Sequence, residues 1–167
     1  MKKQYIPIAI SLSISLFIYL FYRTERTAVN ELVIWLISIE TYTSLKTIIS
    51  NSLPLSDIII YSLPEGLWIF CITLTSKPYY ISWNSWRMDC VYLPLIFCFS
   101  LEILQLIHIT NGRFDFMDIG FFVLFWIFGR YVLSERNVKR HVFTTLNSKT
   151  IFCLASYCIV YLAHVFK

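Results

Sequence analysis

Apolar residues are arranged along the chain in long runs that predict membrane-length helices separated by short polar segments. An α-helix needs about 20 residues to cross a bilayer, and five apolar runs are close to this length. They cover residues 5–22, 58–76, 90–110, 118–134 and 151–166. The first run follows two lysines, as the apolar region of a signal peptide would, but it is too long for one and has no small-residue cleavage site before the next arginine. We therefore expect an uncleaved first span.

Residues 28–49 have a different pattern, in which apolar residues recur at roughly helical spacing and charged residues interrupt them. A helix of this kind lies in the membrane interface with its aromatic residues near the lipid headgroups. The pattern predicts an interfacial amphipathic helix over 28–49, with Trp35 and Tyr42 at the headgroups. A sixth span is the alternative.

Two further segments carry local signals. The stretch 62–65 has the spacing of a helix capping box, and Pro64 suits the first turn of a helix, so we expect the second span to restart or kink at Pro64. Residues 77–89 are expected to form a loop, with Trp83 and Trp86 in the aromatic belt at the membrane surface.

Composition supports the membrane interpretation. Hydrophobic residues make up 57% of the chain and charged residues 14%, and the mean hydropathy is +0.66. Soluble domains average about 45–50% apolar residues and about 25% charged residues. These values exclude an ordinary soluble globular domain, a disordered chain and a large water-filled enzyme. The predicted fold class is an all-α integral membrane protein, a single domain over residues 1–167 with a bundle of about five transmembrane helices and an interfacial helix.

The charged residues and cysteines narrow the picture further. With the N-terminus in the cytoplasm, the inner segments carry eight lysines and arginines and the outer ones five, which favours a multi-pass cell-membrane protein in this orientation. The net charge of +4 is spread along the chain and predicts no nucleic-acid partner. The five cysteines form no CxxC pair and lie mostly in apolar runs, so we expect no disulfide framework, metal site or cofactor.

Glu102 is the most informative residue, because it lies inside the third apolar run, roughly 12 Å from its outer end at 1.5 Å per residue. A carboxylate at this depth costs several kcal/mol unless it is protonated, paired or facing water. Gln105 and His108 follow on the same broad helix face. The alternative is that Glu102 and Gln105 are hydrogen-bonding links between helices without a ligand, and His108 is best explained as a polar residue at the membrane rim.

Other polar residues are expected to converge on the same end. Glu65 lies in the outer half of the second span, Arg113 and Asp115 in the following outer loop, and Asp118 at the head of the fourth span. Arg113 is the natural counter-ion, while Asp118 can also be a simple helix cap favoured by the helix dipole, and Glu65 a simple capping-box residue. The predicted polar site opens to the extracytoplasmic side, with these ligand-binding candidates: Glu65, Glu102, Gln105, Arg113, Asp115 and Asp118.

Two short motifs resemble the signature of the VanZ-like membrane proteins: Glu102-x-x-Gln105 and Gly112-Arg113-x-Asp115-x-x-Asp118. The stretch 62–68 resembles a small branch of that family, and the likeness covers about residues 58–130. Family members usually have an asparagine and a glycine where this chain has Phe122 and Phe125. The founding member is associated with resistance to the glycopeptide antibiotic teicoplanin, so the resemblance implies an envelope protein with a role in antibiotic resistance.

Two functions of different classes follow. In the first, the polar cluster binds an amphiphilic cell-envelope molecule, lipid-linked or of glycopeptide type; if it also catalyses a reaction, Glu102 is the general acid or base and Arg113 holds an anionic group. The chain has no nucleophile elbow, metal-ligand spacing or Gly-rich phosphate loop, which disfavours an enzyme. In the second, the protein is a non-catalytic accessory subunit of a larger membrane complex. The expected partners of the protein are membrane lipids, together with a lipid-linked envelope molecule in the first case or a larger membrane complex in the second. A transporter is disfavoured by the lack of an internal repeat.

Overall fold

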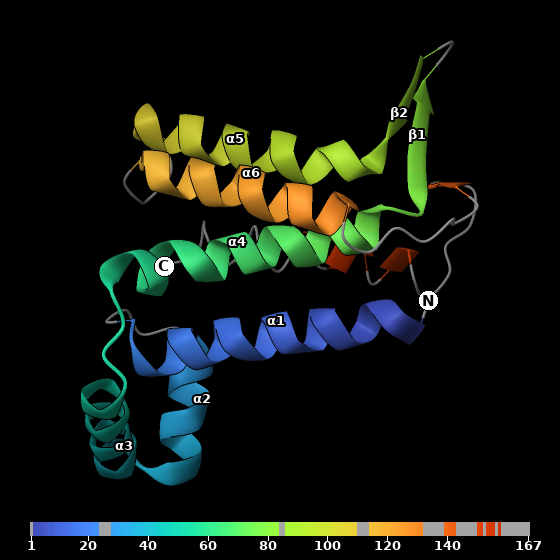
Figure 1. The fold of residues 1–167 in the computed structure, drawn as a ribbon. Helices are drawn as coiled ribbons and strands as arrows, with labels where there is room; N and C mark the ends of the chain where they lie inside the picture. The colour runs from blue at the N-terminus through green and yellow to red at the C-terminus, as the bar shows by residue number, and fades with distance from the viewer. Residues whose placement is uncertain are drawn as a thin grey trace.

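The computed structural model describes residues 2–23, 28–83, 86–109, 114–131, 139–142, 150–151, 153–155 and 157. These residues are mostly helical, with a small three-stranded sheet at one end (Figure 1). The bundle consists of α1 (Lys2–Phe21), α4 (Asp57–Ser76), α5 (Leu93–Leu106) and α6 (Phe116–Tyr131). Helix α4 packs against α1 on one side and against α5 and α6 on the other. The ends of α1 and α5 and the beginnings of α4 and α6 therefore lie at the same end of the bundle (Figure 1).

Helix length separates α4 from its neighbours. Within the described residues, α4 is the one continuous helix long and apolar enough to cross a membrane, while Tyr5–Phe21 and Cys90–Leu106 are shorter apolar helices. Helices α5 and α6 have 14 and 16 residues, or roughly 21–24 Å at 1.5 Å per residue, against about 30 Å of bilayer hydrocarbon. The described residues thus contain one candidate span, or two if the bent pair α2–α3 is one span, and a complete five-span bundle is not shown. Most of the predicted fifth run, 151–166, lies outside the described residues.

The most deeply buried side chains belong to α4, and two glycines let α6 approach it closely. A Cβ atom at Gly66 would lie 2.5 Å from Cδ2 of Phe125, and one at Gly129 would lie 3.1 Å from Cγ2 of Thr73. Phe122 is buried in the same interface and packs in a cluster with Ile69. The two phenylalanines that depart from the VanZ-like pattern are therefore packing residues between α4 and α6.

The predicted interfacial helix over 28–49 is wrong as a single helix. The chain forms α2 (Ala28–Ile37) and α3 (Ile39–Ser52), bent by 115° at Ser38, whose φ of 70° and ψ of 155° break the helix. The pattern of apolar residues continues through this position, and without a glycine or proline the break has no sequence signal. Both helices run crosswise to the bundle at the end where α1 finishes (Figure 1).

The two aromatic residues expected at the headgroups behave differently. Trp35 is 83% exposed, whereas Tyr42 is buried. The Tyr42 hydroxyl donates a hydrogen bond of 2.5 Å to the carbonyl of Leu20, and the amide of Asn30 donates to the same hydroxyl at 2.8 Å. Tyr42 therefore connects α2 and α3 to the end of α1 by hydrogen bonds.

The predicted loop over 77–89 contains a β-hairpin instead. Strand β1 (Tyr79–Trp83) pairs antiparallel with β2 (Trp86–Asp89) and parallel with β3 (Arg140–His141), in the order β2-β1-β3. The aromatic residues that suggested a membrane belt also have high strand propensity, which the loop prediction overlooked. The sheet lies at the end of the bundle opposite α2 and α3 (Figure 1).

Candidate ligand-binding site

Three acidic side chains from three helices meet inside the bundle. Glu65 of α4, Glu102 of α5 and Asp118 of α6 each place one carboxylate oxygen within 4.8 Å of the others. Glu102 is only 3% exposed, and the other two are partly buried. We call these three residues the carboxylate cluster, and the end of the bundle that holds them the cluster end.

The local structure around Glu65 differs from the prediction. Helix α4 begins after Ser56 and continues without interruption through Pro64, so it does not restart there. Ser62 is buried within this helix and therefore cannot form a capping box with Glu65. Glu65 is thus a residue of the helix interior, and its side chain is available for contacts outside α4.

Asp115, rather than Asp118, caps α6. Its Oδ1 accepts a hydrogen bond of 2.9 Å from the backbone N–H of Met117, in the manner of an N-cap residue. The backbone N–H of Asp115 donates to Oε2 of Glu102 at 3.4 Å. Glu102 therefore ties the last turns of α5 to the start of α6, while Asp118 sits in the first turn of α6, where the helix dipole favours a negative charge.

Gln105 and His108 are not brought into the cluster. Gln105 lies one turn beyond Glu102 and is partly exposed, and its side chain has no hydrogen bond to any residue that the structure describes. His108 is exposed just after α5, with a positive φ of 57°. Arg113, the expected counter-ion, lies outside the described residues.

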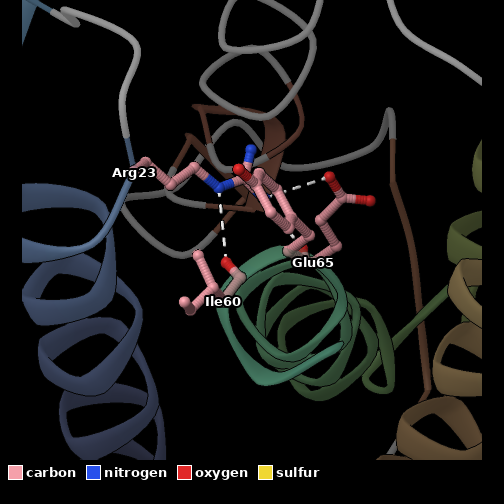
Figure 2. A network of polar contacts seen from close by, with 4 residues as sticks. Arg23, Ile60 and Glu65 are labelled. Atoms are coloured by element: carbon pink, nitrogen blue, oxygen red, sulfur yellow. Dashed lines mark hydrogen bonds and ion pairs between the residues drawn. The ribbon is translucent and has the colours of Figure 1, made fainter. Parts of the chain in front are cut away.

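Arg23, which follows α1, contacts the site and was missed by the sequence analysis. Its Nη2 lies 3.4 Å from Oε1 of Glu65, forming an ion pair between two largely buried side chains (Figure 2). The same guanidinium lies 4.4 Å from the ring centre of Tyr19 and 5.4 Å from that of Tyr61. Arg23 looked like a topology-setting charge because it directly follows the first apolar run. The sequence does contain a signal for this contact. The predicted topology places the end of the first run and the start of the second on the same side of the bundle, so a charge just after the first run could reach Glu65.

The cluster end is also attached to the broken helix. Nζ of Lys46 on α3 donates a hydrogen bond of 2.8 Å to the backbone carbonyl of Arg23. The hydroxyl of Tyr22 donates to the carbonyl of Leu53, just after α3, at 2.7 Å. The position of Arg23 is therefore fixed from both sides, by α3 and by α4.

Chemically, the cluster offers carboxylate oxygens, the ligands that hard divalent cations and amino groups bind. Three ionised carboxylates at this spacing repel one another, so the arrangement favours a bound cationic group or a proton. The sequence predicted no metal site, although Glu65, Glu102 and Asp118 have the spacing of a three-oxygen ligand set. A comparison with family models, with curated proteins and with solved structures found no match to this chain.

Proposed function

We propose that the protein is a multi-pass membrane protein with a cytoplasmic N-terminus, in which α1, α4, the segment Cys90–Leu106, α6 and the apolar run 151–166 lie in the bilayer. The support is that large apolar side chains face outward on the bundle while carboxylates lie inside it. Ile10, Ile103 and Leu124, for example, are all more than half exposed. Exposed apolar surface of this extent suits contact with lipid better than contact with water. Arg87 and Arg140 lie in the sheet at the opposite end from the carboxylate cluster, as the positive-inside rule expects.

We further propose that the carboxylate cluster binds the cationic polar part of an amphiphilic cell-envelope molecule, of the lipid-linked or glycopeptide class, from the extracytoplasmic side. The observation that carries this proposal is the meeting of Glu65, Glu102 and Asp118 within 4.8 Å. Gathering ionisable groups from three apolar helices is unfavourable for folding, and such groupings are typical of functional sites. The resemblance of the motifs to the VanZ-like family favours a glycopeptide such as teicoplanin as the first ligand to test.

The test is teicoplanin binding to the full-length protein in detergent micelles, measured by calorimetry, together with the teicoplanin susceptibility of a bacterial host that expresses each variant. Glu102→Gln and Asp118→Asn remove one negative charge each and should weaken binding about tenfold, the loss that corresponds to about 1.4 kcal/mol. Glu40→Gln, an exposed carboxylate on α3, is the matched control. Unchanged affinity and susceptibility in both cluster variants, with folding retained, would contradict the proposal.

One observation favours a second function, that of an accessory subunit in a larger membrane complex. The bend between α2 and α3 exposes Leu32, Trp35 and Leu36, at 57%, 83% and 62% respectively. Such a patch suits either lipid or a partner protein. If it binds a partner, Trp35→Ala should abolish co-purification of that protein from the native membrane, and a wild-type protein that purifies as a stable monomer would exclude this function.

A further inference from the structure

Pro64 leaves a backbone carbonyl of α4 without its helical donor. In an α-helix, the carbonyl of residue 60 accepts its hydrogen bond from the N–H of residue 64, and proline has no N–H. Pro64 lies inside α4, which remains helical on both sides of it. The carbonyl of Ile60 therefore needs a donor from outside the helix, above all in a protein whose surroundings contain little water.

The guanidinium of Arg23 supplies that donor. Its Nε donates a hydrogen bond of 3.4 Å to the carbonyl of Ile60 (Figure 2). Its Nη2 donates a hydrogen bond of 2.8 Å to the carbonyl of Tyr61. Arginine is suited to this task because its planar guanidinium carries five N–H donors in a fixed arrangement. A side chain from the end of α1 thus completes the hydrogen bonding of α4 at its proline.

The same group also binds the residue after the proline. Nη2 of Arg23 contacts Oε1 of Glu65 at 3.4 Å. Because the carbonyls fix the guanidinium in place, the ion pair restricts the directions that the Glu65 carboxylate can take. The guanidinium also lies over the ring of Tyr19, 4.4 Å from the ring centre.

We propose that Arg23 is the positioning residue of the carboxylate cluster: it replaces the hydrogen bond that Pro64 removes and, from this anchored place, orients Glu65 towards Glu102 and Asp118. The relevance to ligand binding rests on the function proposed above. The anchoring itself does not, because it is a property of the protein without ligand. The anchoring also explains why a proline precedes Glu65. Because Pro64 has no N–H, the carbonyl of Ile60 is free to accept from Arg23, and this hydrogen bond keeps Arg23 beside Glu65.

The test is a double-mutant cycle on the full-length protein in detergent micelles, with Arg23→Gln, Pro64→Ala and both together. Arg23→Gln should lower the melting temperature by about 5 °C in the native background, because it removes the hydrogen bonds that a charged group donates to the two carbonyls. In the Pro64→Ala background, Arg23→Gln should lower the melting temperature by less than half as much, because the N–H of the alanine can donate to the carbonyl of Ile60. Arg130→Gln is the control: Arg130 also stacks on aromatic rings, those of Tyr92 and Trp126, but on the last turn of α6, so its effect should be equal in both backgrounds.

A second readout reports on Glu65 itself. In protein labelled with ¹³C at the glutamate carboxyl carbons, the Glu65 signal, assigned with Glu65→Gln, should move in Arg23→Gln and should not return in the double variant. An equal loss of melting temperature in both backgrounds, or an unmoved Glu65 signal, would overturn the inference. If Arg23→Gln does not fold, Arg23→Lys, which keeps the charge but cannot reach both carbonyls, completes the same cycle. Neither readout needs a ligand, so a failure of teicoplanin binding in the wild type would count against the proposed function alone.

Discussion

The two ends of the bundle use charged side chains in opposite ways. At the sheet end, which holds β1, β2 and β3, the charges are on the surface: Lys139 pairs with Asp89, both partly exposed, and Arg87 lies 3.9 Å from the ring centre of Tyr80. At the cluster end, acidic side chains from three helices face one another between the helices. Charges at the sheet end can be satisfied by water and neighbouring rings, whereas those at the cluster end depend on one another. This difference makes the cluster end the better candidate for a function, and four predictions test it.

The largest expected effect concerns the two close contacts of α6 with α4. Gly66→Ala, at the cluster end, should lower the free energy of unfolding by about 2–3 kcal/mol, because the new Cβ would meet the ring of Phe125 at 2.5 Å. Gly129→Ala, towards the sheet end, meets Thr73 at 3.1 Å and should cost less, about 1 kcal/mol. Thermal unfolding in detergent measures both. Equal losses of unfolding free energy in the two variants would contradict this difference between the two ends. Adding Phe125→Leu to Gly66→Ala should restore part of the lost stability, because the smaller side chain makes room for the new Cβ.

The second prediction is a gain of stability. Glu102→Gln should raise the free energy of unfolding by about 1–2 kcal/mol at pH 8, because it removes one of three mutually repelling carboxylates while keeping an oxygen that can accept from Asp115. A variant that is stabilised but binds teicoplanin less well would mark Glu102 as a residue kept for function. A loss of stability would instead indicate that Glu102 is a structural link between helices.

The third prediction concerns the cap of α6. Asp115→Ala should lower the free energy of unfolding by about 1 kcal/mol, because the N–H of Met117 loses its acceptor. Asp115→Asn keeps an acceptor at the same place and should lose little. If both variants lose the same stability, the charge of Asp115 matters rather than its capping hydrogen bond.

The smallest effect is expected at the sheet end. Asp89→Asn breaks the ion pair with Lys139 and should cost at most about 0.5 kcal/mol, since exposed ion pairs contribute little. The loss should shrink further in 1 M salt, where charges on the surface are screened. A loss larger than that of Asp115→Ala would show that solvent does not screen the charges at the sheet end.

The sequence predicted the helical character of the protein and drew attention to the acidic residues that the structure brings together, because a carboxylate in an apolar run is conspicuous. It did not predict the break at Ser38, which has no glycine or proline signal. It also did not predict the hairpin at 79–89, because the aromatic residues there suit a membrane belt as well as a strand. Arg23 was missed for a different reason. Its partners, Ile60, Tyr61 and Glu65, are some forty residues away, and two of the three contacts are with backbone carbonyls, which no side-chain pattern reveals. The membrane function and the resemblance to the VanZ-like family stay predictions.

In the membrane orientation proposed for this protein, the bend at Ser38 sets the side of the bilayer on which α4 begins. Together, α2 and α3 are long and apolar enough to form one membrane span, and as a straight helix they would carry the start of α4 to the opposite face of the bilayer from the end of α1. Arg23 and Glu65 would then be separated by the thickness of the membrane. In the proposed membrane orientation, the bend at Ser38 keeps both helices at the cluster end, so the end of α1 and the start of α4 lie on the same side of the bilayer. In that orientation, the backbone torsions of Ser38 decide whether Arg23 and Glu65 can lie on the same side of the membrane.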